Sequence, residues 1–481
     1  MNFFSTRDRN ITTTPSNAIV EGISPDGGLY LPEEFPAFPM ESLRDMSGYE
    51  ISAKVLSLLL SDFSYDELFS YVEKAYESFD NGVIAPLQKL GDDHIMELWH
   101  GPTCAFKDVA LSLLPYLLTA SAQKCGIRDE IVILTATSGD TGSAALSGFS
   151  GVAGTSITVF YPEGGVSPMQ KRQMVTNPGK NTAVCAIRGN FDDAQSAVKR
   201  IFTEVKLPKG KRFSSANSIN IGRLAPQIAY YFTAYRDLLL SGEIKYGECV
   251  NFIVPTGNFG DILAGYFAKK MGLFVGKLVS ASNENRVLAD FFETGVYDRR
   301  REFHLTSSPS MDILISSNLE RLIAMTVGCE KNKAYMQDLK EKGIYSLAPD
   351  ELMKLRLDFD GAWVSEEETA KTIKRVFDTY GYLIDPHTAV AYAAKDKVAL
   401  SGKCVILSTA SAYKFTKGVL SALGEVPLSD EFEYLSLLET LTNTEIPKPL
   451  ASLKTAMLHH KDVVDIEDMA DYVLEKLEEV E

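Results

Sequence analysis

The stretch Cys249–Asp261, CVNFIVPTGNFGD, decides the fold. Its first half is a short, continuous apolar run. Its second half is a turn that contains Gly257 and Gly260 and leads into the helix-like sequence DILAGYFAKKMG. An apolar strand followed by a glycine-containing turn and a helix is typical of a parallel sheet with helices on both faces. The stretch therefore predicts an α/β unit.

The same pattern recurs through the middle of the chain. Amphipathic helices are expected at 49–62, 65–79 and 191–205, and further strands at 130–137, 156–162, 182–189, 277–282 and 403–411. Residues 285–395 favour mostly helix, including 311–328 and 365–381, and the acidic C-terminus favours a solvated helix. We expect four regions: an N-terminal helical region (1–90), a smaller α/β domain (91–245), a large α/β domain with a helical insertion (246–425) and a C-terminal helical tail (426–481).

Composition narrows the class of protein. The 481 residues are 45% hydrophobic and 23% charged, as in ordinary globular proteins, and the formal charge of −16 argues against nucleic-acid and anionic-membrane partners. The six cysteines are scattered, which indicates reduced thiols. No signal-peptide pattern opens the sequence, and no apolar run approaches the roughly 18 residues that span a bilayer. We therefore expect a cytoplasmic protein.

Three loops follow predicted strands, at the edge where α/β sheets bind ligands. In TATSGDTGS, Thr135–Ser143, the hydroxyls and amides suit a carboxylate or phosphate, although a capped turn without a ligand explains this loop equally well. In PTGNFGD, Pro255–Asp261, the amides could converge on a phosphate. Neither GxGxxG nor GxxxxGK[ST] occurs, which argues against a dinucleotide fold and a P-loop. The third loop, ILSTAS, Ile406–Ser411, is weak evidence alone.

A lysine completes the pattern. Lys107 lies in HGPTCAFKDVAL, His100–Leu111, beside apolar residues that would lower its pKa by desolvation. Such a lysine can form a Schiff base with a carbonyl cofactor, although a lysine taken alone is more often simply exposed. A phosphate-bearing aldehyde held by a glycine-rich loop and a hydroxyl accounts for all these features together, and that cofactor is pyridoxal phosphate.

Seven motifs in order now carry a resemblance. HGPTCAFKD, ATSGDTG, NSINIGRLAPQIAYYF, PTGNFGD, SPSMDILISSNLER, DPHTAV and LSTASAYKF resemble the threonine synthase family, within the fold type II (tryptophan-synthase-β-like) pyridoxal-phosphate enzymes. FFSTRDRN and EGISPDGGLYLPEE near the N-terminus resemble the longer yeast and enterobacterial type. The resemblance spans residue 3 to about 420. It implies two open, twisted, mostly parallel α/β domains with the cofactor between them, plus a small N-terminal helical region.

The resemblance also implies roles for individual residues. Lys107 would bind the cofactor aldehyde and move protons about the substrate's α, β and γ carbons. Thr409, with Ser408 as a possible helper, would hydrogen-bond the pyridine nitrogen and leave it largely unprotonated. The phosphate cup would consist of Gly257, Asn258, Phe259, Gly260 and Asp261.

Substrate contacts are implied in the same way. Ser138 and Thr141 would hold the substrate carboxylate. Asp140 stands where many relatives in the wider fold type carry Asn, near the cofactor's O3′, so its role is less defined. Candidates for the substrate phosphate are Arg7, Lys171 and Arg223, with Asn217 and Ser218 as polar partners; a solvated surface cation is the alternative for each of the three.

Two other features attract attention. His387 in DPHTAV is expected to cap a helix or pack beneath the site in preference to a catalytic role. We expect no metal, because HExxH and Cys/His clusters are absent from the sequence. Whether the turn Gly101-Pro102-Thr103 touches the substrate phosphate or aims Lys107 is left open.

The implied reaction converts O-phospho-L-homoserine and water to L-threonine and phosphate, the last step of threonine biosynthesis. It proceeds by γ-elimination and β-addition of water, in a monomer or homodimer. One alternative is a phospho-lyase of the same fold that releases a 2-oxo acid and ammonia. Another is a catalytically silent, ligand-binding homologue. The intact Lys107 argues against the second, since a protein that only binds has no need of a Schiff-base lysine.

Overall fold

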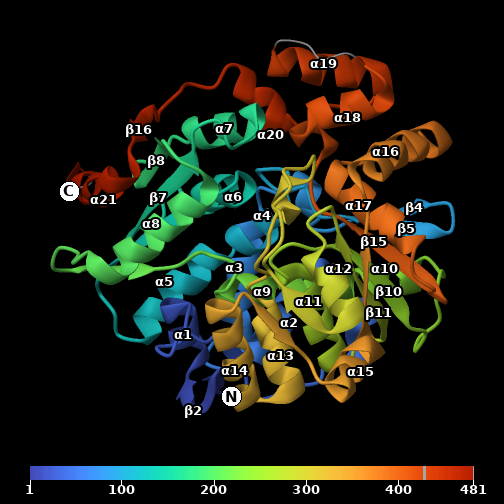
Figure 1. Ribbon diagram of the computed structural model, residues 1–481, viewed down its shortest axis with the longest axis horizontal. Helices are drawn as coiled ribbons and strands as arrows, with labels where there is room; N and C mark the ends of the chain where they lie inside the picture. Colours follow the sequence, from blue (N-terminus) through green and yellow to red (C-terminus); the bar gives the residue numbers. More distant parts are fainter. Residues whose placement is uncertain (426–429, 480–481) are drawn as a thin grey trace.

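Two α/β domains lie side by side in the computed structural model, which describes residues 1–425 and 430–479 (Figure 1). The large domain contains a six-stranded sheet in the order β14-β11-β10-β15-β5-β4, and the small domain a five-stranded sheet in the order β16-β8-β7-β6-β9. All neighbouring strands in these two sheets are parallel except β4 and β5. The expected fold class, two mostly parallel α/β domains, is confirmed.

The bounds of the strands follow the apolar runs of the sequence. The large sheet consists of β4 (Leu87–Leu90), β5 (Asp93–Glu97), β10 (Val250–Pro255), β11 (Val275–Ser282), β14 (Phe359–Trp363) and β15 (Lys403–Ser408). The small sheet consists of β6 (Glu130–Ala136), β7 (Thr155–Pro162), β8 (Thr182–Ile187), β9 (Lys211–Ser214) and β16 (Asp462–Val464).

Side chains that alternate along β10 join two different cores. Phe252 and Val254 belong to the core that also contains α10 (Ile228–Leu240) and α11 (Gly260–Lys270), whereas Ile253 belongs to the core that contains α16 (Glu366–Tyr380) and α17 (Pro386–Lys395). All three side chains are fully buried. Because successive residues of a strand point to opposite faces, the large sheet is covered on both sides.

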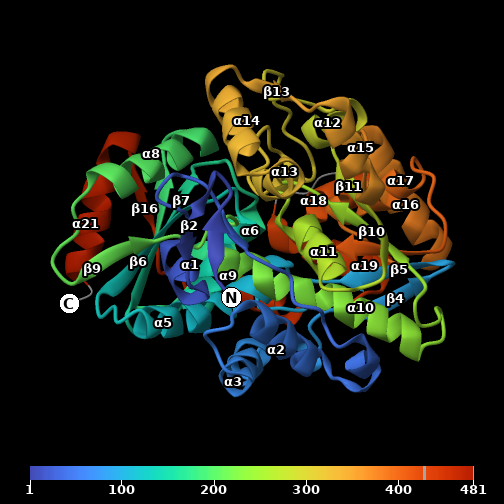
Figure 2. The same cartoon turned by 90° about the horizontal axis from the view of Figure 1, so that it is seen from below.

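The small sheet is covered in the same way. One face packs against α6 (Asp140–Phe149) and α5 (Leu114–Lys124), and the other against α8 (Phe191–Glu204) and α21 (Met469–Glu479). Figure 2 shows α8 and α21 on the outer side of the small sheet and α16 and α17 on the outer side of the large one. The two sheets therefore present their inner helices and loops to each other.

The expected domain boundaries need correction in two places. Residues 91–97 and 228–240 were expected in the smaller domain, yet β5 pairs with β15 in the large sheet and α10 packs against α11. The N-terminal region is not purely helical, since β1 (Phe3–Ser5), β2 (Asp8–Thr13) and β3 (Tyr30–Pro32) form an antiparallel sheet beside α1 (Pro15–Glu21). The expected helices there are confirmed as α2 (Gly48–Leu59) and α3 (Tyr65–Tyr76), each begun by a serine capping box.

The mostly helical reading of 285–395 was also too simple. The helices in this part are α12 (Val287–Thr294), α13 (Leu319–Val327), α14 (Cys329–Glu341), α15 (Pro349–Asp358), α16 and α17. The helix expected at 311–328 is confirmed only for its second half. The strand β14 adds an edge to the large sheet, and β12 (Val296–Asp298) pairs with β13 (Ile344–Ser346).

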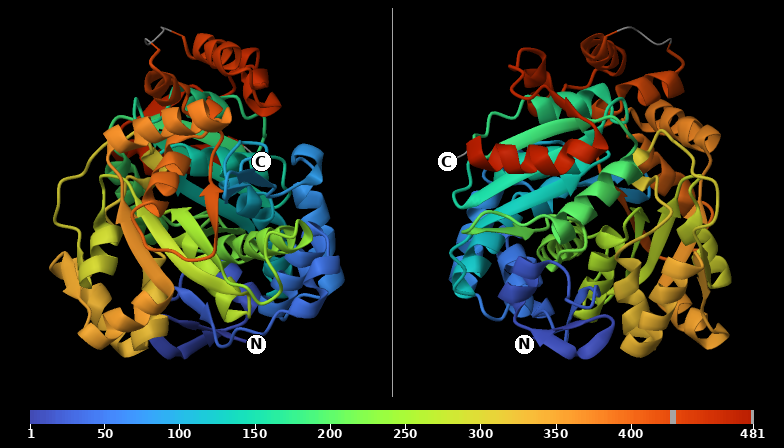
Figure 3. Two further views of the ribbon diagram at one scale, coloured as in Figure 1. Left: turned by 90° about the vertical axis from the view of Figure 1, so that its right-hand side faces the viewer. Right: turned by 60° about the vertical axis from the view of Figure 1, so that its left-hand side comes forward.

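The C-terminal region spans both domains. It runs from α18 (Thr416–Leu423) and α19 (Glu431–Thr442), which pack beside α16, to α20 (Lys448–Ala451), β16 and α21 on the small domain. Figure 3 shows these red segments across the top of the molecule and along the small sheet. The Arg172 side chain of α7 (Pro168–Val175) donates to the carbonyls of Leu453 and Ala456, at 3.0 and 2.9 Å. Of the expected tail, residues 426–429 and 480–481 lie outside the described residues. No described helix has the length and apolar character to cross a membrane.

Candidate active site

Three helices begin at the three motifs that the sequence singled out. Lys107 is the first residue of α4 (Lys107–Leu111), Asp140 is the first residue of α6, and Gly260 is the first residue of α11. The loops before α6 and α11 follow the carboxyl ends of β6 and β10, and Thr409 follows β15. Parallel strands place these ends at one edge of each sheet, so the motifs converge where α/β proteins bind ligands.

The turn before Lys107 is tied to the first turn of its own helix. The Asp108 carboxylate accepts hydrogen bonds from the Thr103 amide at 2.8 Å and from the Thr103 hydroxyl at 2.6 Å. A Cβ at Gly101 would lie 2.5 Å from the Asp108 Cβ, so this close packing requires glycine. The Thr103 hydroxyl is thus used to aim the lysine, which answers for that side chain the question that the sequence left open.

The same turn is also held by the loop after β15. The Phe106 amide donates to the Thr409 carbonyl at 2.8 Å, and the Ser411 amide donates to the Cys104 carbonyl at 3.1 Å. Cys104 has a φ of 57°, in the left-handed region that non-glycine residues rarely adopt. Two motifs separated by 300 residues in the chain therefore form one rigid unit.

The Lys107 amine lies in a mostly buried, mixed-charge environment. Its Nζ lies 3.8 Å from Asp140 Oδ2 and 4.5 Å from the centre of the Phe106 ring, and its side chain is 11% exposed. Burial lowers the pKa of this amine from 10.5 to about 8; Asp140 opposes the shift, while Arg223 and Lys414 add to it. A lysine with such a pKa can serve as nucleophile and base near neutral pH.

Asp140 lies between two lysines. Its Oδ1 is 2.7 Å from Lys414 Nζ and accepts a hydrogen bond from Gln170 Nε2 at 3.0 Å, and its Oδ2 accepts one from the Ser310 hydroxyl at 3.1 Å. The pKa of this buried carboxyl is lowered because the opposing cost of burial is outweighed by the charges of Lys414 and Lys107 and by these hydrogen bonds. Asp140 is therefore a charged partner of the lysine, a more specific position than the sequence implied.

The loop Gly257–Gly260 fits a phosphate group. The backbone amides of residues 257–262 donate no hydrogen bond within the described part of the structure, and those of Gly260, Asp261 and Ile262 begin a helix, where no intrahelical acceptor exists. Phe259 holds the loop in shape with a φ of 65°, and its buried ring stacks on Phe292. Converging free amides at a helix N-terminus are the arrangement that binds phosphate.

Glycine is required in this loop for a specific reason. A Cβ at Gly257 would lie 2.6 Å from the Ser310 carbonyl oxygen, a contact that real Cβ atoms do not make. The Gly257 carbonyl accepts from the Ser316 hydroxyl at 2.6 Å, and the Asn258 carbonyl accepts from the Asn318 amide at 3.0 Å. These bonds turn the carbonyls away and leave the amides free.

The side chain of Asp261 faces elsewhere. Its Oδ1 accepts hydrogen bonds from the hydroxyls of Tyr230 and Tyr231, and burial raises its pKa to about 6. Its Oδ2 has no partner in the described structure. Asp261 therefore contributes its amide to the expected cup, while its carboxyl lies among the tyrosines beneath the loop.

Ser408 and Thr409 divide their roles. The Ser408 hydroxyl accepts hydrogen bonds from Trp99 Nε1 at 3.1 Å and from the Thr388 hydroxyl at 3.0 Å, so it is already engaged. Thr409 is buried, and no described group hydrogen-bonds to its hydroxyl. Thr409 is the better-placed donor of the two for a cofactor nitrogen.

Among the expected substrate contacts, Arg223 has the clearest signature. Its guanidinium is 4% exposed, donates to the Ala216 carbonyl at 3.0 Å, and has a buried Nε without a partner in the described structure. Burial lowers its pKa to about 10, and no described carboxylate pairs with it. A buried cation without a counter-ion beside Lys107 is a site for an anion.

The remaining substrate candidates fall into two groups. Ser138, Thr141, Asn217 and Ser218 are partly exposed, and within the described residues their side chains form no hydrogen bond, so they are free to contact a ligand. Arg7 forms a bidentate ion pair with Glu320, at 2.8 and 2.9 Å, and Lys171 is exposed on α7. The paired Arg7 is thereby removed as a free cation for the substrate phosphate.

His387 lies beneath the site, as expected. Its Nδ1 is 2.6 Å from Asp385 Oδ2, and its Nε2 accepts a hydrogen bond from the Ser310 amide at 3.2 Å. An acceptor at Nε2 places the ring proton on Nδ1, toward Asp385, which also caps α17. His387 therefore supports Ser310, whose hydroxyl reaches Asp140.

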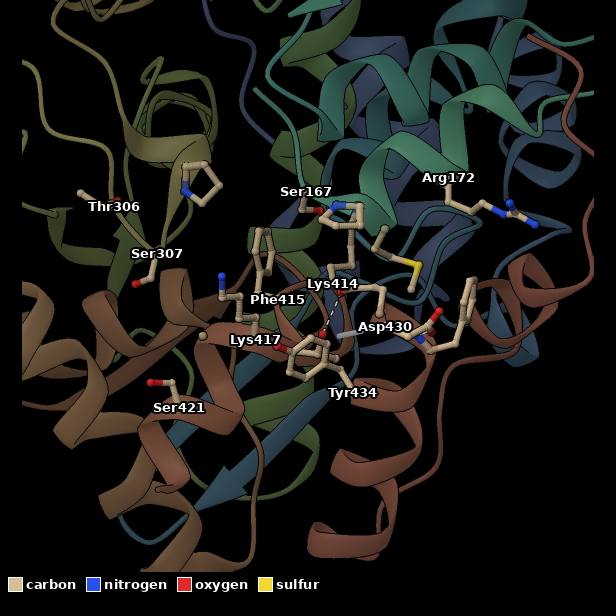
Figure 4. A pocket seen from close by; sticks show the side chains of 17 residues that line it. Ser167, Arg172, Thr306, Ser307, Lys414, Phe415, Lys417, Ser421, Asp430 and Tyr434 are labelled. Atoms are coloured by element: carbon tan, nitrogen blue, oxygen red, sulfur yellow. Dashed lines mark hydrogen bonds between the residues drawn. The ribbon is translucent and has the colours of Figure 1, made fainter. Parts of the chain in front are cut away.

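Lys414 is the residue that the sequence did not single out. It is fully buried in the 3₁₀ turn Ala412–Lys414, directly after the ILSTAS motif, and nothing local distinguishes it from a surface lysine. A cavity of about 880 Å³ adjoins it, between α7, the loop at 306–309 and the segment α18–α19. Figure 4 shows Lys414 in the middle of this cavity, between Ser167 and Arg172 on one side and Lys417 and Tyr434 on the other.

Comparison with known proteins agrees with the fold and the site. The family described as "Pyridoxal-phosphate dependent enzyme" matches residues 94–409, and "Threonine synthase N terminus" matches residues 2–76. The chain is 39% identical to threonine synthase of Pseudomonas aeruginosa, over 96% of this chain and 98% of that one, and 38% identical to that of Schizosaccharomyces pombe, over 88% and 89%. The solved structure of PLP-bound threonine synthase from Brucella melitensis superposes with a TM-score of 0.89 at 36% identity, covering 99% of both chains.

The fold and the site thus define a fold type II pyridoxal-phosphate enzyme, and the cofactor expected from the sequence is confirmed. Within that class, the chain belongs to the threonine synthase family. The resemblance drawn from the seven motifs is confirmed.

Proposed function

We propose that this chain converts O-phospho-L-homoserine and water to L-threonine and phosphate. The observation that carries the proposal is the pairing of Lys107, a buried amine with a lowered pKa, with Arg223, a buried guanidinium that lacks a counter-ion. A pyridoxal-phosphate enzyme needs the first group, and a phosphorylated amino-acid substrate suits the second. The family relationship supports the same reaction.

The cofactor is held by groups from both domains. We assign its covalent attachment to Lys107, its phosphate to the free amides of residues 257–261, and its ring nitrogen to the Thr409 hydroxyl. When bound, the cofactor supplies an electron sink that stabilises negative charge on a substrate carbon. A neutral hydroxyl opposite the ring nitrogen, in place of a carboxylate, moderates that sink.

Lys107 moves the protons. With a pKa of about 8, a substantial fraction of the amine is neutral near pH 7.5, so the residue can accept a proton from one substrate carbon and return it to another. Asp140, 3.8 Å away, stabilises the charged form that results. The Asp108–Thr103 hydrogen bonds fix the start of α4 and keep the amine aimed at one place.

The substrate's two anionic groups have separate contacts. Arg223, with Asn217 and Ser218 nearby in the chain, would bind the leaving phosphate, and Ser138 and Thr141 at the start of α6 would bind the carboxylate. Because the Arg223 guanidinium is already desolvated, its attraction for a phosphate is stronger than that of a surface arginine.

A phospho-lyase that releases a 2-oxo acid and ammonia would use the same lysine and the same anion sites, so product analysis distinguishes the two reactions. The purified holoenzyme is incubated with O-phospho-L-homoserine, and phosphate, threonine and 2-oxobutyrate are assayed separately. We expect phosphate and threonine in equal amounts. Phosphate with 2-oxobutyrate in place of threonine would overturn the proposal.

The setting of the reaction is also part of the proposal. All six cysteines are free thiols, which supports a reducing compartment and hence the cytoplasm. We propose a monomer or a homodimer with a small-molecule substrate as its partner; sedimentation of the holoenzyme over a range of concentrations tests the oligomeric state.

A further inference from the structure

We infer that Lys414 is a positioning residue that tunes the protonation of Lys107 by sharing the carboxylate of Asp140. This inference rests on the proposed role of Lys107 as the cofactor-bearing amine. It assigns a function to a residue that contacts Lys107 only through another side chain.

The geometry of Asp140 is the first step of the argument. Lys414 Nζ lies 2.7 Å from Oδ1, within direct hydrogen-bonding distance, whereas Lys107 Nζ lies 3.8 Å from Oδ2. Lys414 is 0% exposed and Asp140 3% exposed. The closer and more deeply buried cation therefore takes the larger share of the single carboxylate.

Lys414 is held in place from a second side. Its Nζ also donates to the Thr103 carbonyl at 2.9 Å, in the turn that leads to Lys107. Gln173 Nε2 donates to the same carbonyl at 3.0 Å. Lys414 thus joins the Thr103 turn to the Asp140 loop, and its ammonium cannot move toward solvent without breaking both contacts.

The charge balance around Lys107 gives the direction of the effect. Of the groups on the elements packed around it, Arg223 and Lys414 disfavour a charged Lys107, and Asp140 and Asp108 favour it. Asp108 is occupied by two hydrogen bonds from Thr103, and Asp261 by two from tyrosines. Asp140 is therefore the principal anion for Lys107, and Lys414 competes for it.

This competition has a chemical consequence. If Asp140 were free to pair with Lys107 alone, the lysine nitrogen would keep its proton to higher pH and would be a poorer base at neutral pH. A buried second lysine prevents that outcome without removing the carboxylate. Asp140 thus remains available to stabilise the protonated amine during proton transfer.

The test is a spectroscopic pH titration of the holoenzyme. The visible absorbance of the lysine-bound cofactor reports the proton on the Lys107 nitrogen, and it is recorded between pH 6 and 10 for wild type and Lys414→Met. We expect the midpoint to rise by about one pH unit, because loss of one buried like charge shifts a neighbouring pKa by about that much. A shift of one unit means a tenfold lower fraction of neutral nitrogen at a given pH below the midpoint.

Matched variants separate charge from structure. Gln173→Leu removes the neutral donor to the Thr103 carbonyl and should leave the midpoint at the wild-type value. Lys414→Gln keeps a donor at the position and should behave as Lys414→Met does, which covers the case in which the methionine variant does not fold. Asp140→Asn removes the shared carboxylate and should lower the midpoint.

The outcomes are distinguishable from failure of the proposed function. An absorbance profile that is unchanged in Lys414→Met and Lys414→Gln overturns the inference. So does an equal shift in Gln173→Leu, or an upward shift in Asp140→Asn. A wild-type protein with no lysine-bound cofactor would instead contradict the proposed function itself.

Discussion

Thr103 and Asp108 lock the turn before Lys107 to the helix that Lys107 begins: the amide and the hydroxyl of Thr103 both donate to the Asp108 carboxylate, at 2.8 and 2.6 Å. The two residues are buried. Since burial raises the pKa of Asp108 to about 6, the carboxylate depends on these donors to remain charged near neutral pH.

Replacement of Thr103 by valine should destabilise the protein. Valine keeps the shape of the side chain but removes the hydroxyl, so the buried carboxylate loses a donor at a cost of about 1–3 kcal/mol. We expect a lower melting midpoint for Thr103→Val, measured by circular dichroism on the holoenzyme. Thr103→Ser keeps the hydroxyl and is the control; equal melting midpoints for the two variants would show that the hydrogen bond has no such role.

Gly257→Ala should weaken cofactor binding. The new Cβ would lie 2.6 Å from the Ser310 carbonyl, so the loop must shift and its amides no longer converge. We expect at least a tenfold loss of affinity for pyridoxal phosphate, about 1.4 kcal/mol, measured by absorbance titration. Gly48→Ala meets no atom within 4 Å and should bind the cofactor as wild type does.

Arg223→Met should raise the KM for O-phospho-L-homoserine. Loss of a charged hydrogen bond to the substrate phosphate costs about 1.5–3 kcal/mol, or roughly 10–100-fold in binding. Arg7→Met removes a cation of equal charge that is already paired with Glu320, so its KM should stay near the wild-type value. If steady-state kinetics gave the larger KM for the Arg7 variant, the assignment of the phosphate contact would be reversed.

Asp261 should make stability depend on pH. Its folded-state pKa of about 6 lies above the ordinary value of 3.8, so the folded protein retains a proton that the unfolded chain releases. Its contribution to stability is therefore lost as pH rises from about 4 to 6, by up to about 3 kcal/mol.

Asp261→Asn should remove that contribution. The melting midpoint of the variant, relative to wild type, is expected to rise between pH 4 and 7. Asp66→Asn, at an exposed carboxylate in the first turn of α3, is the control and should follow the wild-type curve. Parallel curves for wild type and Asp261→Asn would contradict the prediction.

Much of the molecule could be predicted from sequence because its signals are local. A continuous apolar run followed by a glycine turn, as at Val250–Gly260, predicts both a buried strand and the loop that binds a ligand. Lys107, Thr409 and the loop at 257–260 were identified from such motifs, and the structure brings them to one site.

The features that sequence did not reveal depend on contacts between distant segments. Lys414 is defined by Asp140 and Thr103, which lie 274 and 311 positions earlier in the chain, and no local pattern marks it. The strands β5 and β16 are short and lie far in sequence from their partners β15 and β8. Arg7 was a candidate from its motif, but its pairing with Glu320 is visible only in three dimensions.

Borohydride reduction followed by peptide mapping tests the central claim most directly. Reduction of the holoenzyme fixes the cofactor to the amine that holds it, and mass spectrometry of the digested protein identifies that amine. We predict a pyridoxyl group on Lys107 and none on the Lys107→Ala variant, which should also lose the visible absorbance. Modification of Lys414, the other buried lysine at Asp140, or of no lysine at all, would contradict the assignment.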